Sequence, residues 1–269
     1  MTFAAEWLSL REPYDLRARN AAVLDAVAGA YSRSPSVAVV DLACGTGSTF
    51  RALSPHLPPR QDWQLVDNDL SLLARAMPQT TTATVVVRTA PVDLSLDLEA
   101  ALDGPVELVT TSALLDLVSE QWLERFVVEV AARNLPVYAA LSYDGRATFD
   151  PADALDKDVI AAVNRHQLTD KGFGPALGPD AAANAVARFE KLGYRVVKGT
   201  SDWKFGADDR DIQTEVIAGW AAAAREVGGM PAAGIANWFR RRSDIVAAGR
   251  SSITVGHVDF FARPAAALR

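Results

Sequence analysis

Two carboxylates, Asp41 and Asp67, flank a glycine-rich turn in this chain, and together these residues are suited to bind a nucleoside. An apolar run, typical of a buried parallel strand, leads into Asp41, and a turn with Gly45 and Gly47 follows. Glycine lets the backbone turn sharply and lets a ligand lie against the main chain. A second predicted strand ends at Asp67, about twenty residues further on, where an acid can hydrogen-bond a ribose bound over the first turn.

The details of the turn distinguish between two classes of nucleotide ligand. A dinucleotide-binding turn has the form G-x-G-x-x-G and needs a glycine at position 50, where this chain has Phe50. It also places a pyrophosphate at a helix N-terminus, where a carboxylate directly before the turn is unfavourable. Asp41 suits a ligand with a positive charge, such as an amino-acid ammonium group. We therefore favour a cationic nucleoside, and a nicotinamide-dependent oxidoreductase stays an alternative.

The spans Asp41–Gly47 and Val66–Asp69 resemble the first and second motifs of the class I S-adenosylmethionine-dependent methyltransferases. The resemblance covers about residues 10–143 and implies an α/β fold with a doubly wound, mainly parallel, seven-stranded sheet. It implies S-adenosylmethionine as the cofactor and the transfer of its methyl group, by in-line displacement, to a small-molecule acceptor. A catalytically silent cofactor-binding module or partner subunit on the same fold is the alternative.

The resemblance also implies which residues contact the cofactor, at the strand ends and on a helix expected over 13–31. Asp67 corresponds to the acid on the ribose, and Asp93 with Leu94 to the pair at the adenine edge. Asp67 could instead cap the helix after it, and Asp93 could bond to its own backbone. The expected cofactor residues are Tyr14, Arg19, Asp41, Ala43, Gly45, Gly47, Thr49, Asp67, Asn68, Asp93, Leu94, Thr111 and Ser112.

Two segments depart from the family's pattern. Residues 144–180, after the fifth strand, are rich in turn formers. Residues 211–249 hold two helical patterns, where the family usually joins strands six and seven by a tight hairpin. Loops of this length usually have a function, so we expect both helical insertions to form a substrate lid within a single domain of residues 1–269.

The acceptor determines whether a general base is needed, because only a protonated nucleophile must lose a proton. Asp116 and Tyr143, at the ends of the fourth and fifth strands, and His166 in the first insertion are the candidates. The motif N/D-P-P-Y, which serves amino groups of adenine and glutamine in this family, is absent after the fourth strand, and this favours a small metabolite. The residues expected to contact the acceptor are Asp170, Lys171 and Trp203.

Composition excludes several other classes of protein. Cys44 is the only cysteine, so an intrachain disulfide and a cysteine-rich metal site are excluded, and no metal is expected. The net charge of −6 disfavours nucleic acid as a partner, since Lys and Arg drive phosphate binding. No apolar run reaches the length of a membrane span, and the N-terminus does not resemble a signal peptide. We therefore expect a cytoplasmic protein.

Overall fold

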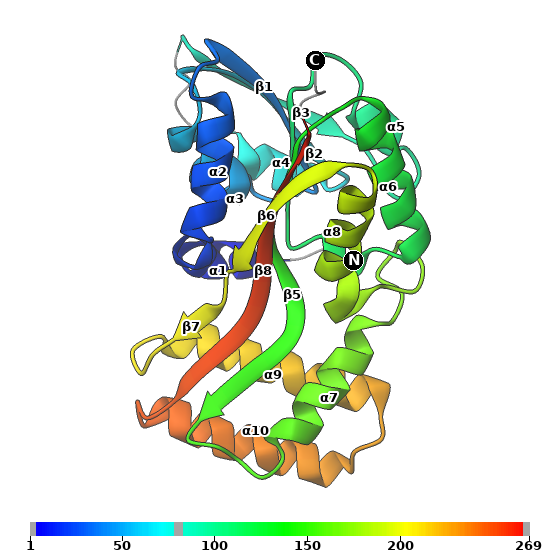
Figure 1. Ribbon diagram of the computed structural model, residues 1–269. Coiled ribbons are helices and arrows are strands. Elements are labelled where there is room, and N and C mark those ends of the chain that lie inside the picture. Colours follow the sequence, from blue (N-terminus) through cyan, green and yellow to red (C-terminus); the bar gives the residue numbers. More distant parts are fainter. Residues whose placement is uncertain (1–3, 78–82, 266–269) are drawn as a thin grey trace.

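The computed structural model describes residues 4–77 and 83–265. Its strands form one sheet in the order β3-β2-β1-β4-β5-β8-β6, and the short β7 pairs with β8 (Figure 1). The pairs among β1 to β5 are parallel, whereas β8 runs antiparallel to β5, β6 and β7. The strands are β1 (Ser36–Leu42), β2 (Arg60–Asp67), β3 (Val85–Pro91), β4 (Leu108–Ser112), β5 (Val137–Asp150), β6 (Tyr194–Thr200), β7 (Trp203–Phe205) and β8 (Ser252–Pro264). The expected doubly wound, mainly parallel sheet is confirmed, with β7 as an additional short strand.

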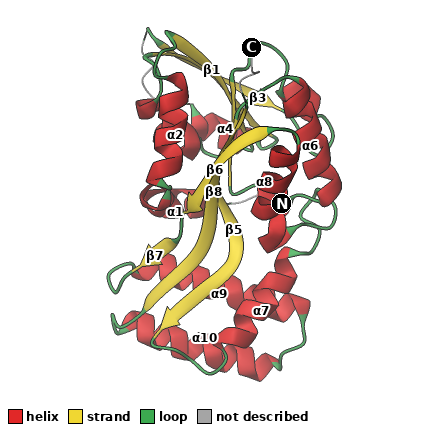
Figure 2. Cartoon of the chain, in the orientation of Figure 1, coloured by secondary structure: helices red, strands yellow, loops and turns green. Residues whose placement is uncertain are grey.

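Helices cover both faces of this sheet (Figure 2). Because side chains alternate along a strand, the neighbours Val39 and Val40 of β1 enter different cores. Val40 packs in the core with α5, α6 and α8, and Val39 in the core with α2, α3 and α4. The helices are α1 (Ala5–Ala18), α2 (Ala21–Tyr31), α3 (Ser48–Leu53), α4 (Leu70–Ala76), α5 (Leu98–Ala101), α6 (Glu120–Ala132), α7 (Asp156–Gln167), α8 (Ala181–Lys191), α9 (Arg210–Val227) and α10 (Ala232–Ala247).

The single helix expected over 13–31 is wrong, because the structure has two helices, α1 and α2, separated at Arg19 and Asn20. Arg19 leaves the helical conformation with ψ at 134°. The side chain of Asn20 accepts a hydrogen bond from the amide of Val23, and this caps α2. The amide of Asn20 donates to Asp259 of β8 at 2.9 Å, so a distant strand fixes the break.

The strands β5 and β8 continue beyond the parallel sheet as an antiparallel ribbon, and α7, α9 and α10 pack on this extension (Figure 1). We call these three helices the cap. The first seven residues of the predicted insertion 144–180 belong to β5, whereas α9 and α10 occupy the insertion 211–249. Register shifts near Leu141 and after Tyr143 bend the ribbon away from the sheet.

A third hydrophobic core holds the cap on the ribbon, and a charged pair lies inside it. Arg242 of α10 is fully buried and forms an ion pair with Asp156 of α7. The indole nitrogen of Trp238 also donates to Asp156, at 2.9 Å. Among the described residues, no helix combines the length and the apolar character needed to cross a membrane.

Candidate cofactor and acceptor site

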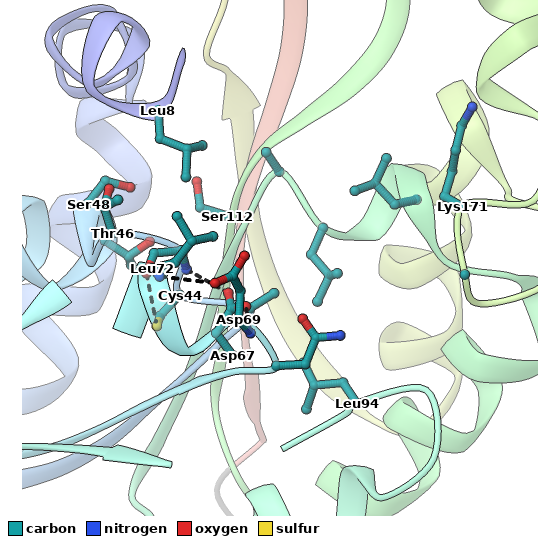
Figure 3. Close-up of a pocket in the computed structure, with 18 of the residues that line it drawn as sticks. Leu8, Cys44, Thr46, Ser48, Asp67, Asp69, Leu72, Leu94, Ser112 and Lys171 are labelled. Carbon is teal, nitrogen blue, oxygen red and sulfur yellow. Dashed lines mark hydrogen bonds between the residues drawn. The ribbon is translucent and has the colours of Figure 1, made fainter. Parts of the chain in front are cut away.

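A first cavity of about 310 Å³ lies over the carboxyl ends of β1, β2 and β4, the place where open α/β sheets bind ligands. The loops after these strands form one side of it, with Asp67 and Cys44 among the lining residues (Figure 3). Leu8, Arg11 and Asp15 of α1 close it on a second side. Residues 171–173, between α7 and α8, form a third.

The turn after β1 has the backbone geometry that its glycines predict. Gly45 and Gly47 have φ angles of +55° and +82°, and Ala43 has +53°. A Cβ atom at position 47 would lie 3.2 Å from the carbonyl oxygen of Ala76. The amide of Gly45 donates to Oδ2 of Asp67 at 2.9 Å, so the acid of β2 holds the turn of β1 and also lines the first cavity.

The first cavity brings together most of the residues that the sequence assigned to a cofactor. Asp93 uses Oδ1 to accept hydrogen bonds from the amide and hydroxyl of Ser95, at 2.9 and 2.6 Å, so it bonds locally and lines the cavity as well. Ser112 lines the cavity, and its Oγ is buried without a hydrogen-bond partner among the described residues. The predicted residues that line it are Ala43, Gly45, Thr49, Asp67, Asn68, Asp93, Leu94 and Ser112.

Asp41 lies beneath the first cavity instead of lining it. Its side chain is fully buried, Oδ1 accepts a hydrogen bond from Thr110 at 2.8 Å, and Oδ2 has no hydrogen-bond partner among the residues that the structure describes. Burial raises the pKa of Asp41 to about 7, while the Thr110 hydroxyl and the charge of Arg19 oppose this rise. A carboxylate in such surroundings gains from a positive charge above it.

The remaining predicted cofactor residues do not line the first cavity. Gly47 is the N-cap of α3, and the hydroxyl of Thr111 donates to the carbonyl of Leu42. Arg19 is buried and donates to the hydroxyls of Tyr138 and Thr49, at 3.2 and 3.4 Å. These three residues support the floor of the cavity.

Tyr14 faces away from the first cavity, contrary to the sequence expectation. Its hydroxyl donates to Asp209 at 3.0 Å, and its ring lies at the edge of Phe205. It lines a different cavity, together with Arg17 and Lys204. Leu8, Arg11 and Asp15 of the same helix do line the first cavity, so Tyr14 lies on a different face of α1.

A second cavity of about 290 Å³ adjoins the first, between the sheet and the cap. Four residues line both cavities, so the two meet at the end of β4, on the side covered by α1. They are Arg11, Ala113, Leu117 and Lys171. Ala113 has a φ angle of +50°, a conformation that L-residues seldom adopt and that often marks functional sites.

All three predicted general bases line the second cavity. Asp116 is buried, its Oδ2 accepts a hydrogen bond from Gln167 at 3.3 Å, and its Oδ1 has no side-chain partner within the described part of the chain. Burial raises the pKa of Asp116 to about 6, while the backbone amides of Asp116 and Tyr143 and the positive charge of Arg11 oppose this rise. The hydroxyl of Tyr143 donates to Asn164 at 2.7 Å, and burial raises its pKa, so this phenol is a poor base.

Lys171 and Trp203, two of the three predicted acceptor residues, also line the second cavity, whereas Asp170 does not. The carboxylate of Asp170 accepts hydrogen bonds from the amides of Gly172 and Gly174, so it shapes the loop that carries Lys171. Nζ of Lys171 donates to Thr169 at 2.8 Å and lies 3.3 Å from Nδ1 of His166. His166 in turn lies 3.2 Å from Glu226 of α9.

Sequence reasoning missed Trp7, Arg11 and His257, which line the second cavity. Trp7 and Arg11 are four positions apart on α1, so a correct helix boundary would have placed them on one face. His257 follows the alternation of inward residues in β8. Its Nδ1 lies 3.0 Å from the carbonyl of Val255, and burial lowers its pKa to about 3, so the ring is neutral.

No model of a protein family matches this chain, and no curated protein matches it either. Solved structures do. A cyclopropane-fatty-acyl-phospholipid synthase-like protein from Lactobacillus casei aligns at 15% identity and a TM-score of 0.52, over 93% of this chain and 98% of that one. The cyclopropane synthase MmaA2 from Mycobacterium tuberculosis aligns at 10% identity and a TM-score of 0.50, over 90% and 83%. With its strand order and its turn after β1, this chain has the fold of the class I S-adenosylmethionine-dependent methyltransferases.

Proposed function

We propose that this protein binds S-adenosylmethionine in the first cavity and transfers its methyl group to a small molecule in the second. The observation that carries the proposal is the junction of the two cavities at Ala113 and Leu117. A methyl group can pass between two ligands only where their sites meet. The volume of about 290 Å³ suits a small acceptor, and the net charge of −6 disfavours nucleic acid.

The residues of the first cavity fit this cofactor. Asp67 has lone pairs left for ribose hydroxyls after it accepts the amides of Gly45 and Asp69. Oγ of Ser112 is a buried polar atom without a partner in the described part of the chain, and a polar ligand in the cavity would satisfy it. Asp41, buried below the turn, would favour the positive charge of an ammonium or sulfonium group.

When bound, the cofactor supplies a methyl group on a positively charged sulfur. The chain has three tasks: to orient this group, to exclude water and to accept a proton if the acceptor carries one. The loops after β1, β2 and β3 perform the first task, and α1 with the cap performs the second. Asp116 is suited to the third, since its Oδ1 has no side-chain hydrogen-bond partner among the described residues.

Calorimetric titration with S-adenosylmethionine and S-adenosylhomocysteine, with NAD as a control, tests the cofactor assignment. We expect Asp67→Ala to raise the Kd roughly 10- to 100-fold, because a hydrogen bond to a charged group contributes about 1.5–3 kcal/mol. Asp62→Ala is the matched control, since this β2 carboxylate pairs with Arg88 on the surface. Equal binding by both variants, or a preference for NAD, would contradict the assignment.

A further inference from the structure

Six of the seventeen residues that line the second cavity have aromatic side chains. Trp7 and Trp203 meet edge to face with ring centroids 6.3 Å apart, and Trp203 lies 4.8 Å from the ring of His257. These six side chains come from α1, β5, α7, β7, α9 and β8, so distant parts of the chain supply them. Aromatic faces and edges bind flat aromatic ligands by stacked and T-shaped contacts. The aromatic residues are Trp7, Tyr143, His166, Trp203, Trp220 and His257.

Two positively charged side chains lie where the cavities meet. Arg11 donates from Nε to Asp15 at 2.8 Å, and its guanidinium lies 5.2 Å from the ring centroid of Trp203. Lys171 is buried, and both residues line both cavities. A neutral amine attacks with its lone pair and needs no base, because the positive charge moves from sulfur to nitrogen and the total charge is unchanged. A hydroxyl must lose its proton, so negative charge develops on its oxygen, which the two cations stabilise.

Asp116 is the carboxylate of this cavity that can take a proton. It follows β4 directly, in a short 3₁₀ turn (Leu115–Leu117), between Ala113 and Leu117 at the junction. Asp116 is 6% exposed, and its Oδ1 has no side-chain hydrogen-bond partner in the described ranges 4–77 and 83–265. A buried acceptor atom without a donor is costly unless a ligand supplies one.

We propose that the acceptor is a flat aromatic compound with a ring hydroxyl, that the protein methylates this oxygen, and that Asp116 accepts the hydroxyl proton. This inference rests on the proposed function and names the substrate class of the same site. The oxygen forms a bond to the methyl carbon as the bond from that carbon to the sulfonium sulfur breaks. The sulfur keeps the electron pair and becomes a neutral thioether, and the proton passes to Asp116 and then to solvent.

The test uses the full chain, S-adenosylmethionine with a labelled methyl group, and matched probes. The probes are phenol, 1-naphthol and 4-hydroxybiphenyl, each with its amino counterpart and its fully saturated alcohol. We expect at least one aromatic hydroxyl compound to give a methyl ether at least tenfold faster than its two counterparts. Faster methylation of the amine or the saturated alcohol, or no ether from any probe, would overturn the proposal.

Two pairs of variants connect this activity to the residues. We expect Asp116→Asn to lower ether formation at least 100-fold while the Kd of S-adenosylhomocysteine changes less than twofold. Asp158→Asn, an exposed carboxylate of α7, is its control. Trp220→Leu is expected to raise the KM for the aromatic probe at least fivefold, and Phe239→Leu, in the same hydrophobic core but outside both cavities, is its control.

The titration with S-adenosylmethionine distinguishes failure of the proposed acceptor class from failure of the proposed function. If the protein binds S-adenosylmethionine and Asp116→Asn leaves ether formation unchanged, the role of Asp116 is wrong and the proposed function stands. If the protein without substitutions does not bind S-adenosylmethionine, the proposed function and the proposed acceptor class are both wrong.

Discussion

The packing of the cap depends on the buried ion pair between Arg242 and Asp156, and we predict the effect of breaking this pair. Arg242→Met keeps a side chain of similar length but removes the charge next to Asp156. Asp156 is 7% exposed, so its carboxylate would stay buried with only neutral donors, the indole of Trp238 and the amide of Asp153. Loss of one partner from such a pair costs about 3–5 kcal/mol.

The neighbouring position supplies a matched control. Arg241 pairs with Asp153, but its side chain is 44% exposed, so solvent screens the charge that Arg241→Met would remove. For a chain of this size, 3–5 kcal/mol corresponds to a decrease in Tm of roughly 6–20 °C. We expect this decrease for Arg242→Met and almost none for Arg241→Met, measured by circular dichroism.

Equal Tm values for the two variants would refute the reasoning, because Arg242 is buried, donates to the carbonyl of Pro151 and lies 4.6 Å from the ring centroid of Phe149, whereas Arg241 is exposed. The reversibility of thermal unfolding should be checked first, because the Tm of an irreversible transition depends on the rate of unfolding and not on an equilibrium.

Two further predictions concern the cavities. Burial raises the pKa of Asp116 to about 6. Because a general base must be ionised to accept a proton, kcat should rise with pH up to about 6 and then level off. A kcat that does not change between pH 5 and 7 would contradict this. Gly47→Ala and Gly193→Ala place a side chain at the same φ of +82° and should each cost about 1–2 kcal/mol in chemical denaturation. Only Gly47→Ala should also weaken cofactor binding, since its Cβ would lie 3.2 Å from the carbonyl oxygen of Ala76 and relief of that contact would shift the turn that lines the first cavity.

The features that depend on neighbouring residues could be predicted from the sequence. The turn with Gly45 and Gly47 is one, because a positive φ is a local requirement that glycine meets at low cost. The distance to Asp67 is another, since a strand, a helix and a second strand fix it. The alternation of Val39 and Val40 between two cores likewise follows from the strand itself.

The features that depend on distant residues could not be predicted in this way. Asn20 ends α1 and begins α2 partly because Asp259, at the other end of the chain, accepts its amide hydrogen bond. β5 continues past Tyr143 because it pairs with β8, and nothing in its own sequence requires that partner. Trp7, Asp116 and His257 line one cavity although they lie on α1, after β4 and on β8.

The two cavities take most of their lining residues from different elements, so substitutions can change one cavity and leave the other as it is. The residues of the turn after β1 and of the ends of β2 and β3 contact only the first cavity, and those of α9 contact only the second. Under the proposed function, we therefore expect substitutions on α9 to change the preference for the acceptor and to leave the turn held by Asp67 intact. Laboratory evolution of new activities should therefore vary α9 positions such as Gly219, Trp220 and Ala223 and keep the residues of the sheet unchanged.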